Sequence, residues 1–200
     1  MLDILEKIIK SVLSSVYQPF WFSLLTAVLL MFVYMFAREH GVKTLLLKWW
    51  NEFKKSSSFR ILFLFMFYLT LVLFRTLLNR NLWANPLSDV IGPWGLHNRE
   101  GEFTTEAIEN FMLFIPLIVL LFCAVRDKII KTKVTFFKIL GSSAIISFGF
   151  SMAIEFTQLF LRLGNFQLSD LFHNTLGGIV GGIIYWAGYK IKEKTDSKKR

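Results

Sequence analysis

Five long apolar stretches dominate this sequence and leave few folds open to it. They lie at residues 17–37, 61–78, 107–125, 134–161 and 168–189. A helix that crosses a bilayer needs about 20 consecutive, mostly apolar residues, and each stretch reaches or approaches that length. The stretches are continuous rather than alternating, which argues against the strands of a transmembrane β-barrel. The sequence therefore predicts an all-α, polytopic membrane helix bundle with about five transmembrane helices.

The composition points the same way. Residues of the AVILMFWYC set make up 54% of the chain and charged residues 18%, whereas globular proteins average about 25% charged residues. Twenty-two phenylalanines and six tryptophans are too many for the core of a soluble domain of 200 residues. The single cysteine, Cys123, excludes an intrachain disulfide framework and a multi-cysteine metal site. The first stretch is longer than the ~7–15-residue core of a signal peptide, so we expect a retained anchor.

The positions of lysine and arginine predict the orientation. Residues 38–60 hold six of them, residues 126–138 hold five, and the tail 190–200 holds six. Cytoplasmic segments of membrane proteins are enriched in Lys and Arg. Five spans with the N-terminus outside place all three segments, and the C-terminus, in the cytoplasm. The net charge of +9 thus reflects membrane topology, and we expect no nucleic-acid partner.

The chain divides into three regions. Residues 1–58 hold an amphipathic segment, an extra span and a basic loop, residues 59–189 form the main four-helix membrane domain, and residues 190–200 form a basic tail. Two segments have the pattern of amphipathic helices that lie on a membrane surface, residues 1–16 and residues 42–55. For residues 1–16, a frayed extension of the first span is the alternative. Residues 42–55 combine leucines and tryptophans with lysines. Serines 56–58 read as a joint. The Pro- and Gly-containing loop 79–105 is expected outside.

Polar side chains inside the last four spans gather at one depth. In the predicted orientation all lie in the outer half of the bilayer: Arg75, Glu109, Asn110, Glu155, Gln158, Arg162, Asp170, His173 and Asn174. A charge near the bilayer centre costs about 2.5–3.5 kcal/mol, so such groups should face one another or a wet cavity. The short connection 163–167 should make a hairpin of the last two spans. We expect a polar pocket open to the outside; for the two amides, simple bonding between helices is the alternative.

Other residues in these spans favour packing over chemistry. Gly177, Gly178, Gly181 and Gly182 recur at the spacing that lets helix backbones approach closely. Pro116, midway in the third span, favours a kink. No HExxH, Walker A, GxGxxG or GxSxG pattern occurs. We therefore expect no metal and no cofactor.

Three segments carry a family resemblance: ENFMLFIPL (109–117), IEFTQLF (154–160) and LSDLFHNTLGGIVGG (168–182). Taken in order, they resemble the VanZ-like membrane proteins, whose pattern is an Asn six residues before a Pro, then Glu-x-x-Gln, then an Asp four residues before Asn-x-x-Gly. The resemblance covers about residues 60–188 and leaves out the first span and its basic loop. The matching positions are Asn110, Pro116, Glu155, Gln158, Asp170, Asn174, Gly177 and Gly181.

The chain also departs from that pattern. Ile118 stands where the family often has a glycine two residues after the proline. The hairpin reads Asn165-Phe166-Gln167 where the family often has Arg-x-Phe-Asp, so that an arginine and an aspartate are missing together. Arg162, three residues earlier, is the nearest substitute for the arginine.

The resemblance implies a multi-pass protein of the bacterial plasma membrane with a role in resistance to teicoplanin and related lipoglycopeptides. The pocket residues would then bind a membrane lipid, a lipid-linked cell-wall precursor or the antibiotic: Arg75, Glu109, Asn110, Glu155, Gln158, Arg162, Asp170 and Asn174. An intramembrane enzyme acting on such a lipid is the alternative, with Glu155 or Asp170 as general base and His173 in support. A small transporter or a structural partner also stays open, and the glycine face would suit a homo-oligomer.

Overall fold

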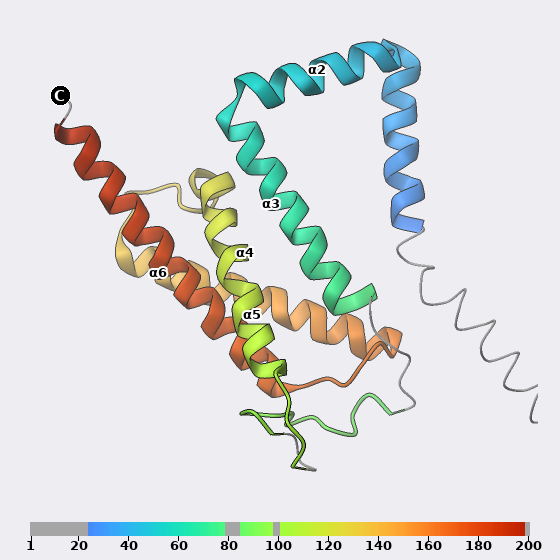
Figure 1. Cartoon of the computed structure of the whole chain (residues 1–200), viewed down its shortest axis with the longest axis vertical. Helices are drawn as coiled ribbons and strands as arrows, with labels where there is room; N and C mark the ends of the chain where they lie inside the picture. The colour runs from blue at the N-terminus through green and yellow to red at the C-terminus, as the bar shows by residue number, and fades with distance from the viewer. Residues whose placement is uncertain (1–23, 79–84, 98–100, 199–200) are drawn as a thin grey trace, which may run out of the picture.

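Helices make up nearly all of the described chain. The computed structural model describes residues 24–78, 85–97 and 101–198 (Figure 1). Within these residues the only β-pairing is an isolated bridge between His97 and Phe103, so the predicted all-α class is confirmed. The helices are Leu24–His40, α2 (Val42–Lys55), α3 (Ser57–Leu73), the π-helix η1 (Phe74–Leu78), α4 (Glu106–Ile129), α5 (Phe136–Leu161) and α6 (Leu168–Lys198).

Several of these helices have the length and composition to cross a membrane. Three helices meet both requirements: Ser57–Leu77, Glu106–Ile129 and Phe136–Leu161. The bent pair of Leu24–His40 and α2 makes a fourth candidate if the two helices form one span. Helix α6 lies at the fifth predicted span and continues to Lys198, but it is not apolar enough to be among these candidates, because polar residues and glycines lower its mean hydropathy. The membrane helix bundle is thus confirmed, with three or four candidate spans among the described residues where the sequence predicted about five. Its orientation stays a prediction. The amphipathic segment 1–16 lies outside the described residues.

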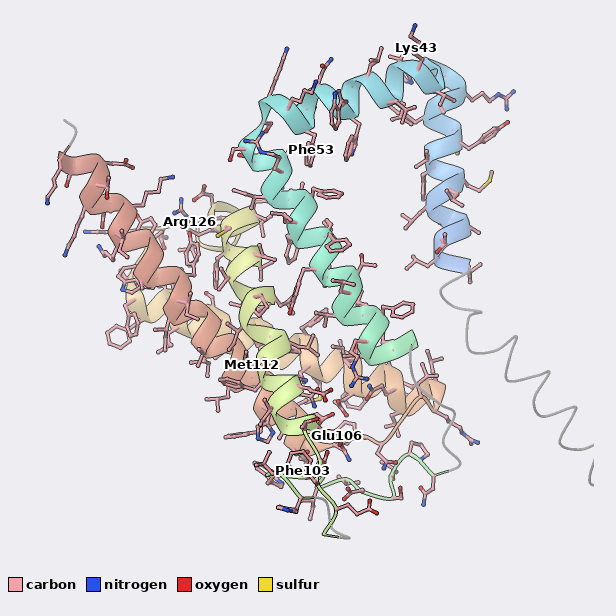
Figure 2. The ribbon with its side chains drawn as sticks, in the orientation of Figure 1. Lys43, Phe53, Phe103, Glu106, Met112 and Arg126 are labelled. Atoms are coloured by element: carbon pink, nitrogen blue, oxygen red, sulfur yellow. The ribbon has the colours of Figure 1, made fainter. Side chains whose placement is uncertain are left out.

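The first two described helices meet at a sharp bend. Leu24–His40 and α2 meet at 106°, and α2 buries none of its residues (Figure 2). Helix α2 is joined to α3 at Ser56, whose side chain accepts a hydrogen bond from the backbone N–H of Phe59 at 3.1 Å. Arg60 donates to the last carbonyls of α2, those of Phe53 and Lys54, at 2.9 Å each. The serine joint expected from the sequence is therefore a helix cap that sets the angle between α2 and α3.

The core lies between α4 and its neighbours α3, α5 and α6. Figure 1 shows α4 and α6 running in the same direction, with their N-terminal ends at the same end of the bundle. Phe114, Ile118 and Phe122 of α4 are almost fully buried in this core. The sequence led us to expect a kink in α4 at Pro116, but the residue with non-helical backbone angles is Val125, with φ −137°. The kink therefore lies at the far end of α4 from the polar residues.

Glycines on α6 bring it against the backbone of α4. A Cβ atom placed on Gly177 would collide with the carbonyl of Phe111, and one placed on Gly181 would lie 2.5 Å from the carbonyl oxygen of Ile115. The two contacts are one helical turn apart on each helix, as two parallel helices in constant register require. No residue with a side chain fits at these two positions without moving a helix.

Candidate functional site

A second series of close contacts, after that between α4 and α6, sets the register between α5 and α6. Serines recur every fourth residue along the buried face of α5, and each has no exposed surface. Three positions of α5 meet three of α6 in antiparallel order: Ser143 with Gly182, Ser147 with Gly178, and Ser151 with Asn174. The last of these contacts is a hydrogen bond of 2.8 Å from Asn174 Nδ2 to Ser151 Oγ.

The next pair of positions in this series, which face each other across the interface, holds two carboxylates. Four residues after Ser151 on α5 is Glu155, and four residues before Asn174 on α6 is Asp170. Glu155 is 1% exposed and Asp170 7% exposed. Their positions follow from the helix period, because residues four apart lie on the same face of a helix. The two buried acids therefore share the end of the α5–α6 interface at which the hairpin turn joins the two helices.

Glu155 also holds the hairpin turn that joins these helices. One of its carboxylate oxygens, Oε2, accepts a hydrogen bond from the backbone N–H of Gln167 at 2.8 Å. The side-chain amide of Gln167 in turn lies 3.5 Å from Asp89 in the preceding loop. A carboxylate that accepts from a backbone N–H makes a strong, charge-assisted contact. Glu155 thus has a definite structural role whatever else it does.

Residues 85–92 of the long loop pack along the same turn. The backbone N–H groups of Phe166, Leu168 and Ser169 donate to carbonyls of this loop, at 2.9, 2.8 and 3.1 Å. The N–H groups that open a helix have no partner within it, and here loop carbonyls satisfy those of α6. Gly92, with φ +69°, lies so close to Ser169 that a side chain there would clash. Residues 85–92 of the loop are therefore packed against the start of α6.

Gln158 connects α5 to the π-helix. Its side-chain amide donates to the backbone carbonyl of Thr76 at 2.7 Å, and the contact is buried. The hydroxyl of Thr76 bonds back to the carbonyl of Val72 at 2.9 Å. A π-turn disturbs the regular carbonyl ladder of a helix and is frequent at functional sites. The side chain of Gln158 therefore bonds between helices, as the packing alternative expected.

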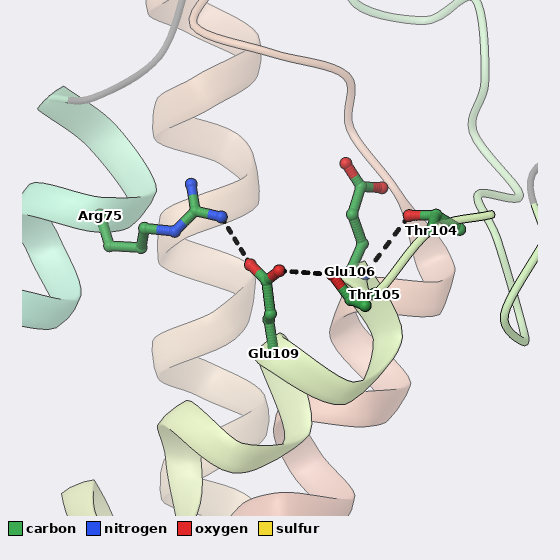
Figure 3. Close-up of polar contacts among 5 residues, drawn as sticks. All are labelled: Arg75, Thr104, Thr105, Glu106 and Glu109. Carbon is green, nitrogen blue, oxygen red and sulfur yellow. Dashed lines mark hydrogen bonds and ion pairs between the residues drawn. The ribbon is translucent and has the colours of Figure 1, made fainter.

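A half-exposed ion pair stands at the same end of the bundle. Figure 3 shows Arg75 of η1 reaching Glu109 of α4, with a distance of 2.6 Å between Nη2 and Oε2. The second oxygen of Glu109 accepts from the hydroxyl of Thr105, also at 2.6 Å. The two side chains are 47% and 42% exposed. The carboxylate thus holds the guanidinium in place at the surface of the bundle.

A small cavity lies beside this ion pair. Its volume is about 60 Å³. It is lined by Arg75, Thr76, Glu106, Glu109, Asn110 and Leu113. Thr76 is common to both groups of polar contacts, since it lines the cavity and accepts from Gln158 through its carbonyl. The residues expected to line one pocket thus fall into two groups, one beside the cavity at Arg75 and one buried at Glu155 and Asp170.

Two of the expected site residues lie at the edge of this arrangement. Arg162 is the C-cap of α5, in the left-handed conformation with φ 53°, and is exposed. His173 is partly buried; its Nδ1 lies 2.7 Å from the carbonyl of Ser169, and its ring centroid is 6.0 Å from that of Trp94. Within the described ranges no group of three or more His, Cys, Asp or Glu side chains could hold a metal ion.

The sequence reasoning missed the serines of α5. Ser143, Ser147 and Ser151 face α6 and carry the register that places Glu155 opposite Asp170. Their signal was present, because small residues recur every fourth position up to Glu155. The role of Gln167, by contrast, depends on its backbone N–H and has no signal in side-chain chemistry.

The family comparison agrees with the motifs. A family model described as VanZ/LLP1 matches residues 20–189. The match includes residues 20–59, which the motif resemblance left out. No curated protein and no solved structure matches the chain. Because the match covers most of the 200 residues and contains the whole polar arrangement, the chain belongs to the VanZ/LLP1 family.

Proposed function

We propose that this protein binds the phosphate-bearing head group of a membrane lipid, or of a lipid-linked cell-wall precursor, at Arg75. In this proposal it acts in the outer leaflet of a bacterial plasma membrane and lowers susceptibility to teicoplanin-type lipoglycopeptides. The observation that carries the proposal is a half-exposed guanidinium held by Glu109 at the end of a membrane helix bundle. Family membership adds support, because the member that gives the VanZ-like family its name is associated with that resistance.

The geometry of Arg75 suits an anion at the membrane surface. A guanidinium has five N–H donors in a fixed plane, and the contact with Glu109 uses one at Nη2. Such a group matches the oxygens of a phosphate in a bidentate contact. Glu109 is held in turn by Thr105, so the arginine is oriented before a ligand arrives. Preorganisation of this kind lowers the entropic cost of binding.

The size of the cavity places the head group at its mouth. Each buried water needs about 10–15 Å³ of cavity volume, so the cavity of about 60 Å³ holds only a few waters. A lipid head group is larger than that. The phosphate would therefore contact the exposed edge of Arg75, with water filling the space toward Asn110.

Substitution of Arg75 tests the proposal. We expect Arg75→Gln to reduce both the lipid that co-purifies with the protein and the teicoplanin concentration that cells tolerate, because the charge is lost. Charge-assisted hydrogen bonds contribute about 1.5–3 kcal/mol, or roughly 10- to 150-fold in affinity. Arg162→Gln is the matched control, since Arg162 is also exposed but lies at the C-cap of α5. Unchanged resistance and lipid content in well-expressed Arg75→Gln protein would contradict the proposal.

The paired acids favour a second candidate, an intramembrane enzyme that modifies the lipid. Glu155 and Asp170 are buried at facing positions, and pairs of carboxylates are typical general acids and bases. Glu155→Gln keeps an oxygen that can accept from Gln167, so the hairpin turn should survive. An enzyme would lose turnover in this variant and in Asp170→Asn, and the cellular lipid profile would change. A lipid profile that is the same with and without the protein would exclude this candidate.

A further inference from the structure

An apolar cavity lies between α3, α4 and α5. Its volume is about 210 Å³. It is lined by Phe65 and Leu69 of α3, by Phe114, Leu117 and Leu121 of α4, and by Phe150 of α5, among others; Ser147 is the one polar side chain in its lining. All three helices are long and apolar enough to cross a membrane. The cavity therefore faces hydrocarbon rather than water.

The apolar cavity follows the polar site along helix α4. On α4, Asn110 and Leu113 line the polar cavity, and the next residue, Phe114, begins the apolar lining that ends at Leu121. From Asn110 to Leu121 is about 16 Å along the helix at 1.5 Å per residue. That length matches half of the ~30 Å hydrocarbon core of a bilayer, which is the depth of one leaflet.

From this continuity we infer that the hydrocarbon chain of the lipid whose phosphate contacts Arg75 lies in this apolar cavity. The inference rests on the proposed head-group site. The ligand class is a phosphate-headed amphiphile with a chain long enough to reach the bilayer midplane. Its head group lies beside Glu109, and its chain runs along α4 toward Leu121.

The volume of the apolar cavity suits a hydrocarbon chain and is too small for a helix. A helix about 10 Å wide would fill 210 Å³ with only about 3 Å of its length, or two residues. An apolar cavity of about 150 Å³ stays dry and binds benzene, which has six carbons. By proportion this cavity holds about eight carbons of a chain. A helix of a second copy, or the exposed apolar helix Leu24–His40, cannot enter it.

One hydrogen bond links the head-group site to helix α5, which forms a wall of the apolar cavity. Helix α5 meets η1 through the buried bond from Gln158 to the carbonyl of Thr76. The same residue, Thr76, lines the polar cavity next to Arg75. The head-group site on η1 and α4 and the chain site on α3, α4 and α5 therefore share helix α4, and the bond of Gln158 ties α5 to η1.

Native mass spectrometry of the full chain in mild detergent tests this inference. The probes are phosphatidylglycerol and undecaprenyl phosphate, which share a phosphate on a long hydrocarbon chain, and the retained probe identifies the source. Glycerol 3-phosphate carries the phosphate without the chain. We expect it not to displace either lipid at the same concentration, and full displacement by it would overturn the inference.

Variants separate the chain site from the head-group site. Leu69→Trp fills the cavity from α3, and we expect it to reduce the bound lipid about fivefold or more, because the indole takes the space of the chain; fivefold is about 1 kcal/mol of binding free energy. Leu64→Trp is the matched control, because Leu64 is on the same helix but 49% exposed. Ile146→Phe fills the cavity from α5 and serves if the first variant does not fold.

The outcomes are distinct. Loss of lipid in Arg75→Gln and in each cavity-filling variant that folds, with retention in Leu64→Trp, supports the inference. Loss in Arg75→Gln alone would overturn it and leave the proposed head-group site standing. Loss in the cavity-filling variants alone would overturn the head-group proposal and the link between the two sites.

Discussion

The contact between Gly181 and α4 gives a quantitative test of the structure. A Cβ on Gly181 would lie 2.5 Å from the carbonyl oxygen of Ile115, whereas ordinary contacts begin at 3.4 Å. The carbonyl belongs to a helix backbone and cannot rotate away. Gly181→Ala therefore forces α4 and α6 apart by about 0.9 Å, or bends one of them.

The size of the effect follows from two opposing contributions. Overpacking in a well-packed core costs about 1–3 kcal/mol. Replacing a helical glycine by alanine gains up to about 1 kcal/mol in helix propensity. Gly188 is in the same helix and has no atom within 4 Å of the position that a Cβ would take, so Gly188→Ala receives only the gain. The difference between the two variants isolates the clash, about 1–3 kcal/mol in the free energy of unfolding.

Equilibrium unfolding in mixed micelles, titrated with SDS, measures this difference. We expect Gly181→Ala to unfold at lower SDS than the wild-type chain and Gly188→Ala at the same or higher SDS. Equal unfolding free energies for the two variants would refute the parallel register of α4 and α6. Helical content by circular dichroism checks that both variants begin folded.

Three further predictions test other contacts. Gly178→Ala should destabilise the protein and Ser147→Gly should restore part of the loss, because the two positions meet across α5 and α6; additive effects in a double-mutant cycle would contradict this pairing. Gln158→Leu should cost about 1–3 kcal/mol in unfolding free energy, since it leaves a buried carbonyl of η1 unpaired, and a loss below about 0.5 kcal/mol would count against that bond. In a cysteine-free background, Leu87→Cys should react with an impermeant thiol reagent in intact cells and Ser197→Cys only after lysis; the reverse pattern would overturn the predicted orientation.

Apolar patterning was enough to predict the helices. Each of the five apolar stretches overlaps a helix within the described residues, which begin at Leu24, because a long continuous apolar run satisfies its backbone bonds only as a helix in lipid. The helix of residues 42–55 was also foreseeable from its combination of apolar and aromatic residues with lysines. The ends were less well predicted: α6 runs on to Lys198, and the break in α4 is at Val125 rather than at Pro116.

The sequence by itself determined which polar residues lie at one end of the bundle, since depth along a helix follows directly from position in the chain. Only the tertiary structure decided their partners. Arg75 pairs with Glu109, while Glu155 accepts from the backbone of Gln167 and Arg162 stays exposed at a helix end. Partners depend on the rotation and register of each helix, which close backbone contacts such as that of Gly181 fix between segments far apart in the chain.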